Sequence, residues 1–318
     1  MSENGRMLTV RPTGAVLGAT IEGLDLSRPM SDGEFAQVLT ALGRHGVLRF
    51  PDQHLDSRAL KTFSERFGDI QGSISGSSGH DPEVPEVGFL SNVMENGRYI
   101  GLPDAGQDWH TDMSYRDVMG FVNVLYGVTI PRRDGMVLGG TEFSNMHAAY
   151  EGLPDDVKTS LRDATAVHDF EKFWEHMRQD KASTRPALTD EQRRRRPPVT
   201  HPVFMTHPIT GRKVLYANPG YTIRINGFDA RASDEMLEFL FTHQLQPKYR
   251  HTHTWTERDV LVWDHFGTIH RAIADYGPDE YRLMKRCQVM ATKILDPDFV
   301  RGALGNDEGA ELTKAAHL

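Results

Sequence analysis

From Trp109 onward the chain repeats short strand patterns that only a few helical stretches interrupt. A parallel sheet would need a crossover helix between successive strands, and that alternation is absent here. Many short strands with a helical insertion are typical of an antiparallel sandwich or jelly roll. We therefore expect a mainly β fold with flanking helices. The strand patterns are Phe121–Tyr126, Val203–Met205, Val214–Tyr216, Tyr221–Ile225, Val260–Trp263 and Cys287–Ala291.

The N-terminal part of the chain predicts strands and two helices. Ser31 and Glu34 have capping-box spacing ahead of an apolar helical stripe. Strands are expected over 8–11, 19–22 and 46–50, a second helix over 57–67, and a strand near 87–90. Further helical patterns lie near 146–150, 155–163 and 234–244.

No internal repeat and no clean linker divides the sequence, so we expect one domain over 1–318. Residues 70–106 are rich in Gly, Ser, Pro and Asp. A loop of this length in a compact domain is often functional, and we predict that it forms a mobile loop or lid. A helical and loop insertion is expected near 145–200.

Composition excludes several classes of protein. The formal net charge of the 318 residues is −8, which argues against nucleic acid as the main partner. The basic run Arg193–Arg196 is interpreted as a solvated loop. The single cysteine, Cys287, excludes an internal disulfide framework and fits a reducing compartment. No apolar stretch has the length of a membrane span and no secretory signal is visible, so a soluble, cytoplasmic protein is expected.

Two histidines and an aspartate suggest a metal site. His110 and Asp112 are two residues apart, so on a strand they would face the same side. His270 lies far downstream, after a strand pattern and a turn that contains glycine. Two imidazoles and one carboxylate form a facial triad that leaves three positions of an octahedral metal open. This set suits ferrous iron that binds a cosubstrate and oxygen together.

Other histidines compete for these roles. His265 is close enough to His270 to replace it in the triad. His251 and His253 also have alternating spacing, but no carboxylate accompanies them. His201 and His207 each precede a proline and are interpreted as turn residues.

Several residues are candidates for cosubstrate or substrate binding. Arg282 and Arg286 would share one face of a strand, and an arginine near a metal can pair bidentately with a carboxylate. Thr141 is a hydroxyl beside a flexible glycine pair. Trp109 and Tyr115 are placed to wall a pocket. The asparagine of the Asn92-Val93 pair is a further substrate-binding candidate.

The order and spacing of these motifs resemble the taurine dioxygenase/phenoxyacetate dioxygenase (TauD/TfdA) family of iron(II)- and 2-oxoglutarate-dependent oxygenases, over about residues 8–295. The motifs that carry the resemblance are Gly18–Leu26, Trp109–Asp112, Gly139–Phe143, His201–Arg212, and Trp263-Asp264 followed by His270, Asp275-Tyr276 and Arg282.

The resemblance implies a double-stranded β-helix, which is a cupin-like jelly roll. It implies that His110, Asp112 and His270 bind Fe(II), and that Arg282 and Thr141 bind 2-oxoglutarate. Arg286 then becomes the candidate for an acidic group of the substrate. With O2, such an enzyme hydroxylates a small organic acid (a sulfonate, a carboxylate, or an aryloxy or alkyl sulfate compound) and releases succinate and CO2. Relatives are commonly dimers or tetramers, so a homo-oligomer is expected.

The chain departs from the family pattern at a few positions. The family often has Trp-Asp-Asn-Arg where this chain has Trp263-Asp264-His265-Phe266. The segment before Trp109 also lacks a match to the residues that contact the sulfonate of taurine. Asp112 argues for hydroxylation, desaturation or cleavage rather than halogenation. Two alternatives stay open: a cupin-type metal enzyme that does not use 2-oxoglutarate, and a non-catalytic binding protein on the same fold.

Overall fold

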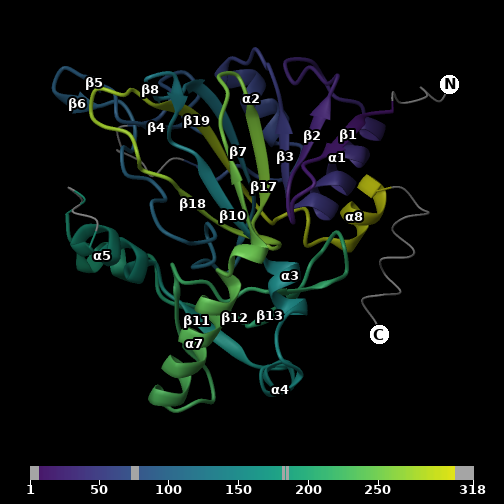
Figure 1. The fold of residues 1–318 in the computed structure, drawn as a ribbon, viewed down its shortest axis with the longest axis vertical. Helices are drawn as coiled ribbons and strands as arrows, with labels where there is room; N and C mark the ends of the chain where they lie inside the picture. The colour runs from purple at the N-terminus through teal and green to yellow at the C-terminus, as the bar shows by residue number, and fades with distance from the viewer. Residues whose placement is uncertain (1–6, 73–78, 181–182, 184–185, 305–318) are drawn as a thin grey trace.

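Two facing sheets form the core of the protein (Figure 1). The computed structural model describes residues 7–72, 79–180, 183 and 186–304. Its largest sheet has seven strands in the order β1-β2-β3-β17-β7-β19-β4. Their bounds are β1 Thr9–Pro12, β2 Ala19–Glu22, β3 Val47–Phe50, β17 Val260–Asp264, β7 Gly120–Thr129, β19 Leu283–Met290 and β4 Gly88–Ser91.

The second layer is a three-stranded antiparallel sheet in the order β16-β10-β18. Its strands are β16 Arg250–His253, β10 Thr141–Asn145 and β18 Thr268–Ala272. Phe143 of β10 packs on Trp263 of β17 with ring centroids 5.5 Å apart, which joins the two layers through an apolar core. These two layers agree with the mainly β sandwich or jelly roll that the sequence predicts.

Three helices cover the other face of the large sheet (Figure 1). They are α1 Asp32–His45, α2 Ser57–Ser64 and α8 Pro297–Leu304. The predicted capping box is present, because Ser31 accepts from the backbone of Glu34 while the Glu34 side chain accepts from the backbone of Ser31. The second helix ends at Ser64, three residues earlier than predicted, but Phe67 is still buried.

A second group of elements lies at the other end of the molecule (Figure 1). The predicted insertion near 145–200 is not only helix and loop. It contains β11 Thr165–His168, which pairs with β12 Val199–Pro202 and with β15 Thr222–Ile225. The remaining elements of this region are α3 Met146–Glu151, α4 Asp155–Ser160, α5 Phe170–Asp180, α6 Asp190–Arg194, β13 Phe204–Thr206, β14 Lys213–Leu215, α7 Ala230–Gln244 and the 3₁₀ turn η1 Pro247–Tyr249.

The predicted loop over 70–106 contains strands. β4 belongs to the large sheet, and β5 Met94–Glu95 pairs with β6 Arg98–Tyr99 in a hairpin. Residues 73–78 of this loop lie outside the described residues, and its role as a lid stays a prediction. A second small hairpin joins β8 Arg132–Arg133 to β9 Met136–Val137. No helix among the described residues is long and apolar enough to cross a bilayer.

Candidate metal centre

His110 and His270 are brought together by the main chain. His270 lies within β18, and His110 forms a single antiparallel bridge with it just before the chain turns away. The bridge places the two imidazole rings side by side, with their centroids 4.3 Å apart. Both side chains are buried.

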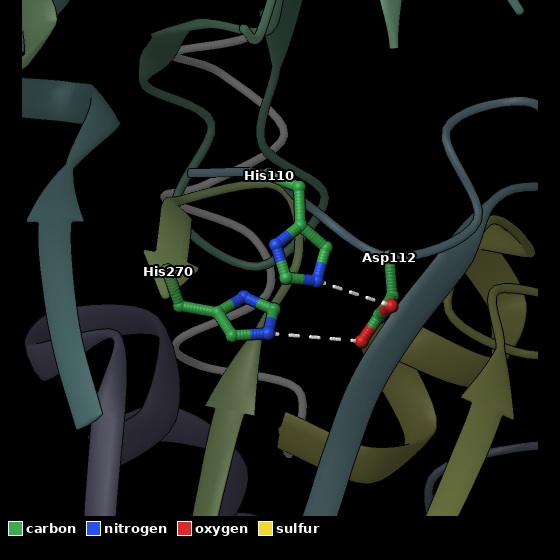
Figure 2. A group of neighbouring side chains, drawn as sticks. All are labelled: His110, Asp112 and His270. Carbon is green, nitrogen blue, oxygen red and sulfur yellow. Dashed lines mark ion pairs between the residues drawn. The ribbon is translucent and has the colours of Figure 1, made fainter. Parts of the chain in front are cut away.

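The carboxylate of Asp112 faces both imidazoles (Figure 2). Its Oδ1 lies 3.6 Å from Nε2 of His110, and its Oδ2 lies 3.8 Å from Nε2 of His270. The predicted route to this arrangement is wrong, because Asp112 does not continue a strand from His110. It begins a turn in which Met113 has a φ of 60°. The turn, rather than alternation along a strand, directs the carboxylate back to the histidines.

Three ligand atoms thus meet at one point. One atom from each of His110, Asp112 and His270 lies within 4.8 Å of the other two. Within the described part of the chain, no other three His, Cys, Asp or Glu side chains converge in this way. The donor set is two nitrogens and one carboxylate oxygen, which fits an octahedral metal with open positions.

The protonation states also fit a metal. Burial raises the pKa of Asp112, but its pairing with His110 and the charges of His110, His270 and Arg286 outweigh burial and hold this pKa well below its usual range. Burial, with His110 nearby, holds the pKa of His270 well below its usual range. At neutral pH the site therefore offers a carboxylate and a neutral imidazole, the forms that bind metals.

A backbone carbonyl group fixes the orientation of the His110 ring. Its Nδ1 lies 2.7 Å from the carbonyl oxygen of Asp108, to which a ring N–H donates. This bond selects the tautomer whose Nε2 lone pair faces Asp112. Such a partner behind a ligating imidazole is usual at metal sites.

The rival histidines do not join this group. His265 is buried, but its ring lies 6.0 Å from that of His270, and it is not among the converging donors. His253 lies on β16 with Nε2 3.6 Å from a carboxylate oxygen of Asp259. His201 is on β12 rather than in a turn, whereas His207 caps a turn as predicted, with Nδ1 accepting from the backbone at 209 and 210.

A cavity beside the three donors collects most of the other predicted residues. His110 and His270 line it together with Thr141, Arg282 and Arg286. Leu90, Leu125 and Trp263 supply an apolar wall. In the antiparallel pairing of β19 with β7, Arg286 stands opposite Leu125, so both side chains face this cavity.

Arg282 is a cation without an acidic partner among the described residues. It is buried, its Nε has no hydrogen-bond partner there, and its guanidinium carbon lies 6.0 Å from the centre of the Tyr276 ring. Gly139, with a φ of 70°, lies against it: a Cβ at this position would stand 3.3 Å from Nε of Arg282. A buried guanidinium without an acidic partner is costly, so this position fits an anion from outside the chain.

Thr141 lines the same cavity as Arg282. Its hydroxyl oxygen accepts a hydrogen bond from Nε1 of Trp255 at 3.0 Å, which leaves the hydroxyl proton free to donate. Both side chains are buried. The residues present therefore fit a metal with a chelating dicarboxylate beside it.

Three predicted substrate residues do not line this cavity. Asn92, the asparagine before Val93, donates to the carbonyl oxygens of Gly277 and Glu280, both at 3.2 Å, and so fixes a loop. The Trp109 ring packs in the core of the α3 region, under the guanidinium of Arg271.

Tyr115 packs among other aromatic rings rather than against the cavity. It packs edge-on against Phe170 and at a tilt against Tyr221, each with ring centroids 4.8 Å apart. Phe173 of α5 in turn covers the His110 ring at 4.8 Å. Nothing in the local sequence of α5 pointed to this contact, because α5 and His110 meet only through the tertiary fold.

Asn123 is a polar cavity residue that sequence reasoning missed. It lies on β7, is fully buried, and donates to Oδ2 of Asp112 at 2.5 Å. A signal was available, because asparagine is depleted in strands and this one interrupts the apolar run Phe121–Tyr126.

A jelly roll in which two histidines and one carboxylate converge is typical of the mononuclear non-haem iron oxygenases. The chain matches the family described as "Taurine catabolism dioxygenase TauD, TfdA family" over residues 9–288, and it belongs to that family. It is therefore an enzyme of the 2-oxoglutarate-dependent dioxygenase class, which uses Fe(II), 2-oxoglutarate and O2.

Individual relatives agree with this assignment. Pentalenolactone F synthase of Streptomyces avermitilis is 32% identical over 288 residues, which cover 87% of this chain and 92% of that protein. The alpha-ketoglutarate-dependent 2,4-dichlorophenoxyacetate dioxygenase of a Burkholderia species is 28% identical, over 79% of this chain and 84% of that one. The solved structure of AAD-2 with Mn(II) and N-oxalylglycine superposes with a TM-score of 0.73 at 26% identity, covering 90% of this chain and 98% of that chain.

Proposed function

We propose that His110, Asp112 and His270 hold the ferrous iron of this dioxygenase, and that its substrate is a small organic acid. The observation that carries the metal assignment is the convergence of three buried donors within 4.8 Å. The neutral imidazole and charged carboxylate that burial and pairing favour support the same assignment.

The second part of the proposal concerns 2-oxoglutarate. Arg282 binds its far carboxylate through a charge-assisted pair, and the Thr141 hydroxyl donates a hydrogen bond to the same group. The buried guanidinium without an acidic partner among the described residues supports this role. When bound, iron and 2-oxoglutarate supply an oxidative decarboxylation that consumes O2, releases succinate and CO2, and provides the oxidant for the substrate.

The third part concerns the substrate. Arg286 faces the cavity from β19 and binds the acidic group, while Leu90, Leu125 and Trp263 contact the apolar remainder. A carboxylate, sulfonate, sulfate ester or aryloxy acid fits one cation beside an apolar wall. The 2,4-dichlorophenoxyacetate dioxygenase among the relatives, named for an aryloxy acid, supports this class.

In this proposal the protein binds and orients the metal, the cosubstrate and the substrate, and it excludes water from the site. The bridge between His110 and β18 fixes the two nitrogens, and burial of the site removes bulk water from it. The two arginines place cosubstrate and substrate on the same side of the metal donors, so that a C–H bond of the substrate is presented for hydroxylation. Hydroxylation, or a desaturation or cleavage that begins in the same way, is the expected outcome.

A turnover screen tests the proposal. The purified protein with Fe(II) and 2-oxoglutarate is offered a panel of small carboxylates, sulfonates, sulfate esters and aryloxy acids, and succinate is measured. We expect substrate-stimulated succinate release that Asp112→Ala abolishes. The control Asp279→Ala changes an exposed carboxylate and should keep full activity. Full activity of Asp112→Ala would remove Asp112 from the metal. Conversion of a substrate without 2-oxoglutarate would favour a different cupin-type enzyme.

Assembly and compartment are further expectations. We expect a homo-oligomer, a dimer or a tetramer, from the family resemblance, and light scattering of the purified protein tests it. A cytoplasmic location is expected from the single cysteine, Cys287, which is buried in β19.

A further inference from the structure

Asn123 presents a fully buried amide to the metal-binding carboxylate. It lies on β7, between β17 and β19 in the large sheet, and stands opposite Trp263 of β17 and Gln288 of β19. Its Nδ2 donates to Oδ2 of Asp112 at 2.5 Å. The amide therefore reaches Asp112 from the cavity wall, whereas the histidines reach it from β18 and the bridge.

The direction of this hydrogen bond is fixed by chemistry. An ionised carboxylate only accepts hydrogen bonds, so the amide must turn its NH2 group toward Asp112. A carboxylate binds a metal in its ionised form. A donor to a charged carboxylate makes one of the stronger protein hydrogen bonds.

The rest of the amide is poorly satisfied. Oδ1 of Asn123 is buried and finds no hydrogen-bond partner among the described residues. Leaving a buried carbonyl unpaired costs about 1–3 kcal/mol. An apolar side chain at this strand position would avoid that cost and would match the neighbouring Val122 and Val124, both fully buried. The amide is therefore poorly explained by core stability alone.

We propose that Asn123 is a positioning residue for the metal: it holds Oδ2 of Asp112 so that Oδ1 is the oxygen left to bind. This inference rests on the proposed role of Asp112 as a ligand. A free carboxylate can rotate and bind a metal through both oxygens. Holding one oxygen restricts Asp112 to a single coordination position, which keeps the other positions open for the cosubstrate and O2.

A measurement of metal binding, which does not depend on turnover, tests this role. The protein is stripped of metal, and binding of Mn(II) alone is measured by the electron paramagnetic resonance signal of free Mn(II). Asn123→Leu keeps the side-chain size and removes the donor. Loss of a partner that orients a ligand typically weakens metal binding by about 10- to 100-fold, and we expect a loss in this range. The matched control is Gln288→Leu, which removes an amide from the neighbouring strand at the same level and should bind Mn(II) like the wild type.

The outcomes separate this inference from the proposed function. Wild-type Mn(II) affinity in Asn123→Leu, with strong loss in Asp112→Ala, overturns the role of Asn123 and leaves the metal site standing. Wild-type affinity in Asp112→Ala overturns both. Equal losses of Mn(II) affinity in Asn123→Leu and Gln288→Leu also overturn the role of Asn123, because the loss then does not depend on the hydrogen bond to Asp112. If Asn123→Leu does not fold by circular dichroism, Asn123→Ala takes its place with the same expected loss.

Discussion

His110 and His270 exchange a pair of backbone hydrogen bonds: the N–H of His110 donates to the carbonyl of His270 at 3.0 Å, and the N–H of His270 donates back at 2.8 Å. Two side chains from distant segments are thus set by one main-chain bridge. Because the bridge uses no side-chain atom, replacing either imidazole leaves the frame of the site in place. A substitution of either imidazole therefore removes a ligand atom but keeps the hydrogen bonds that join the two segments.

His270 and His265 are expected to respond differently to substitution by alanine. His270→Ala should abolish 2-oxoglutarate turnover and weaken Mn(II) binding by orders of magnitude, because a converging nitrogen is lost. His265→Ala should retain Mn(II) binding, because its ring is not among the converging donors, although the buried ring leaves a gap that lowers stability. Mn(II) titration with circular dichroism checks both. The reverse pattern would make His265 the ligand.

The three converging side chains were predictable from sequence, because two histidines and an aspartate in this order are a recognisable set of metal ligands. The way in which the fold brings these side chains together was not predictable from the sequence. Alternation along a strand was the wrong reason for pairing His110 with Asp112, since the bridge and the turn at Met113 are tertiary features. The fold class was predictable because strand and helix patterns are set by nearest neighbours in the chain.

Some of the residues predicted to bind cosubstrate or substrate line the cavity, and others do not. Arg282 and Arg286 share the cavity, as their spacing before and within β19 allows. Trp109 and Asn92 were assigned by nearness in sequence to the metal motif or its loop, yet their side chains serve the core and a loop. Asn123 was missed because its partner lies across a sheet whose register no local pattern specifies.

Arg282 should control the requirement for 2-oxoglutarate. Arg282→Gln removes the charge that the far carboxylate would meet, and a buried charged pair is worth about 2–5 kcal/mol, so the KM for 2-oxoglutarate should rise by at least about 30-fold. Steady-state succinate release at varied 2-oxoglutarate measures this. Arg286→Gln is the matched comparison, because it should raise the KM of the primary substrate instead. An unchanged 2-oxoglutarate KM in Arg282→Gln would reject the clamp.

A side chain at Gly267, in the turn that leads into β18, should destabilise the protein. Oδ1 of Asp264 accepts from the backbone of Phe266 at 2.7 Å and of Gly267 at 2.8 Å. A Cβ on Gly267 would stand 2.5 Å from Oδ2 of the same aspartate. Gly267→Ala should therefore lower the free energy of unfolding by about 1–3 kcal/mol and weaken Mn(II) binding, since His270 follows this turn.

The control for this turn is Gly277→Ala, where the nearest heavy atom to a new Cβ, an oxygen of Glu280, is 3.6 Å away. Urea unfolding and Mn(II) titration of both variants decide the matter. Equal stability of Gly267→Ala and the wild type would mean that the turn opens at little cost.

Buried histidines away from the metal should make the protein less stable in mild acid. Burial, aided by His207, lowers the pKa of His147 to about 4, and burial, aided by His201, lowers that of His168 to about 3. In the unfolded chain a histidine titrates near 6.5, so between about pH 4 and 6.5 the unfolded state binds protons that the folded state refuses. Stability contributed by each group is complete above pH 6.5 and falls by about 1.4 kcal/mol per pH unit as the pH drops through this window. Urea unfolding at pH 7, 6 and 5 measures the slope, and His147→Gln should flatten it by about one proton. The same slope in the variant would mean that His147 takes up its proton in the folded protein.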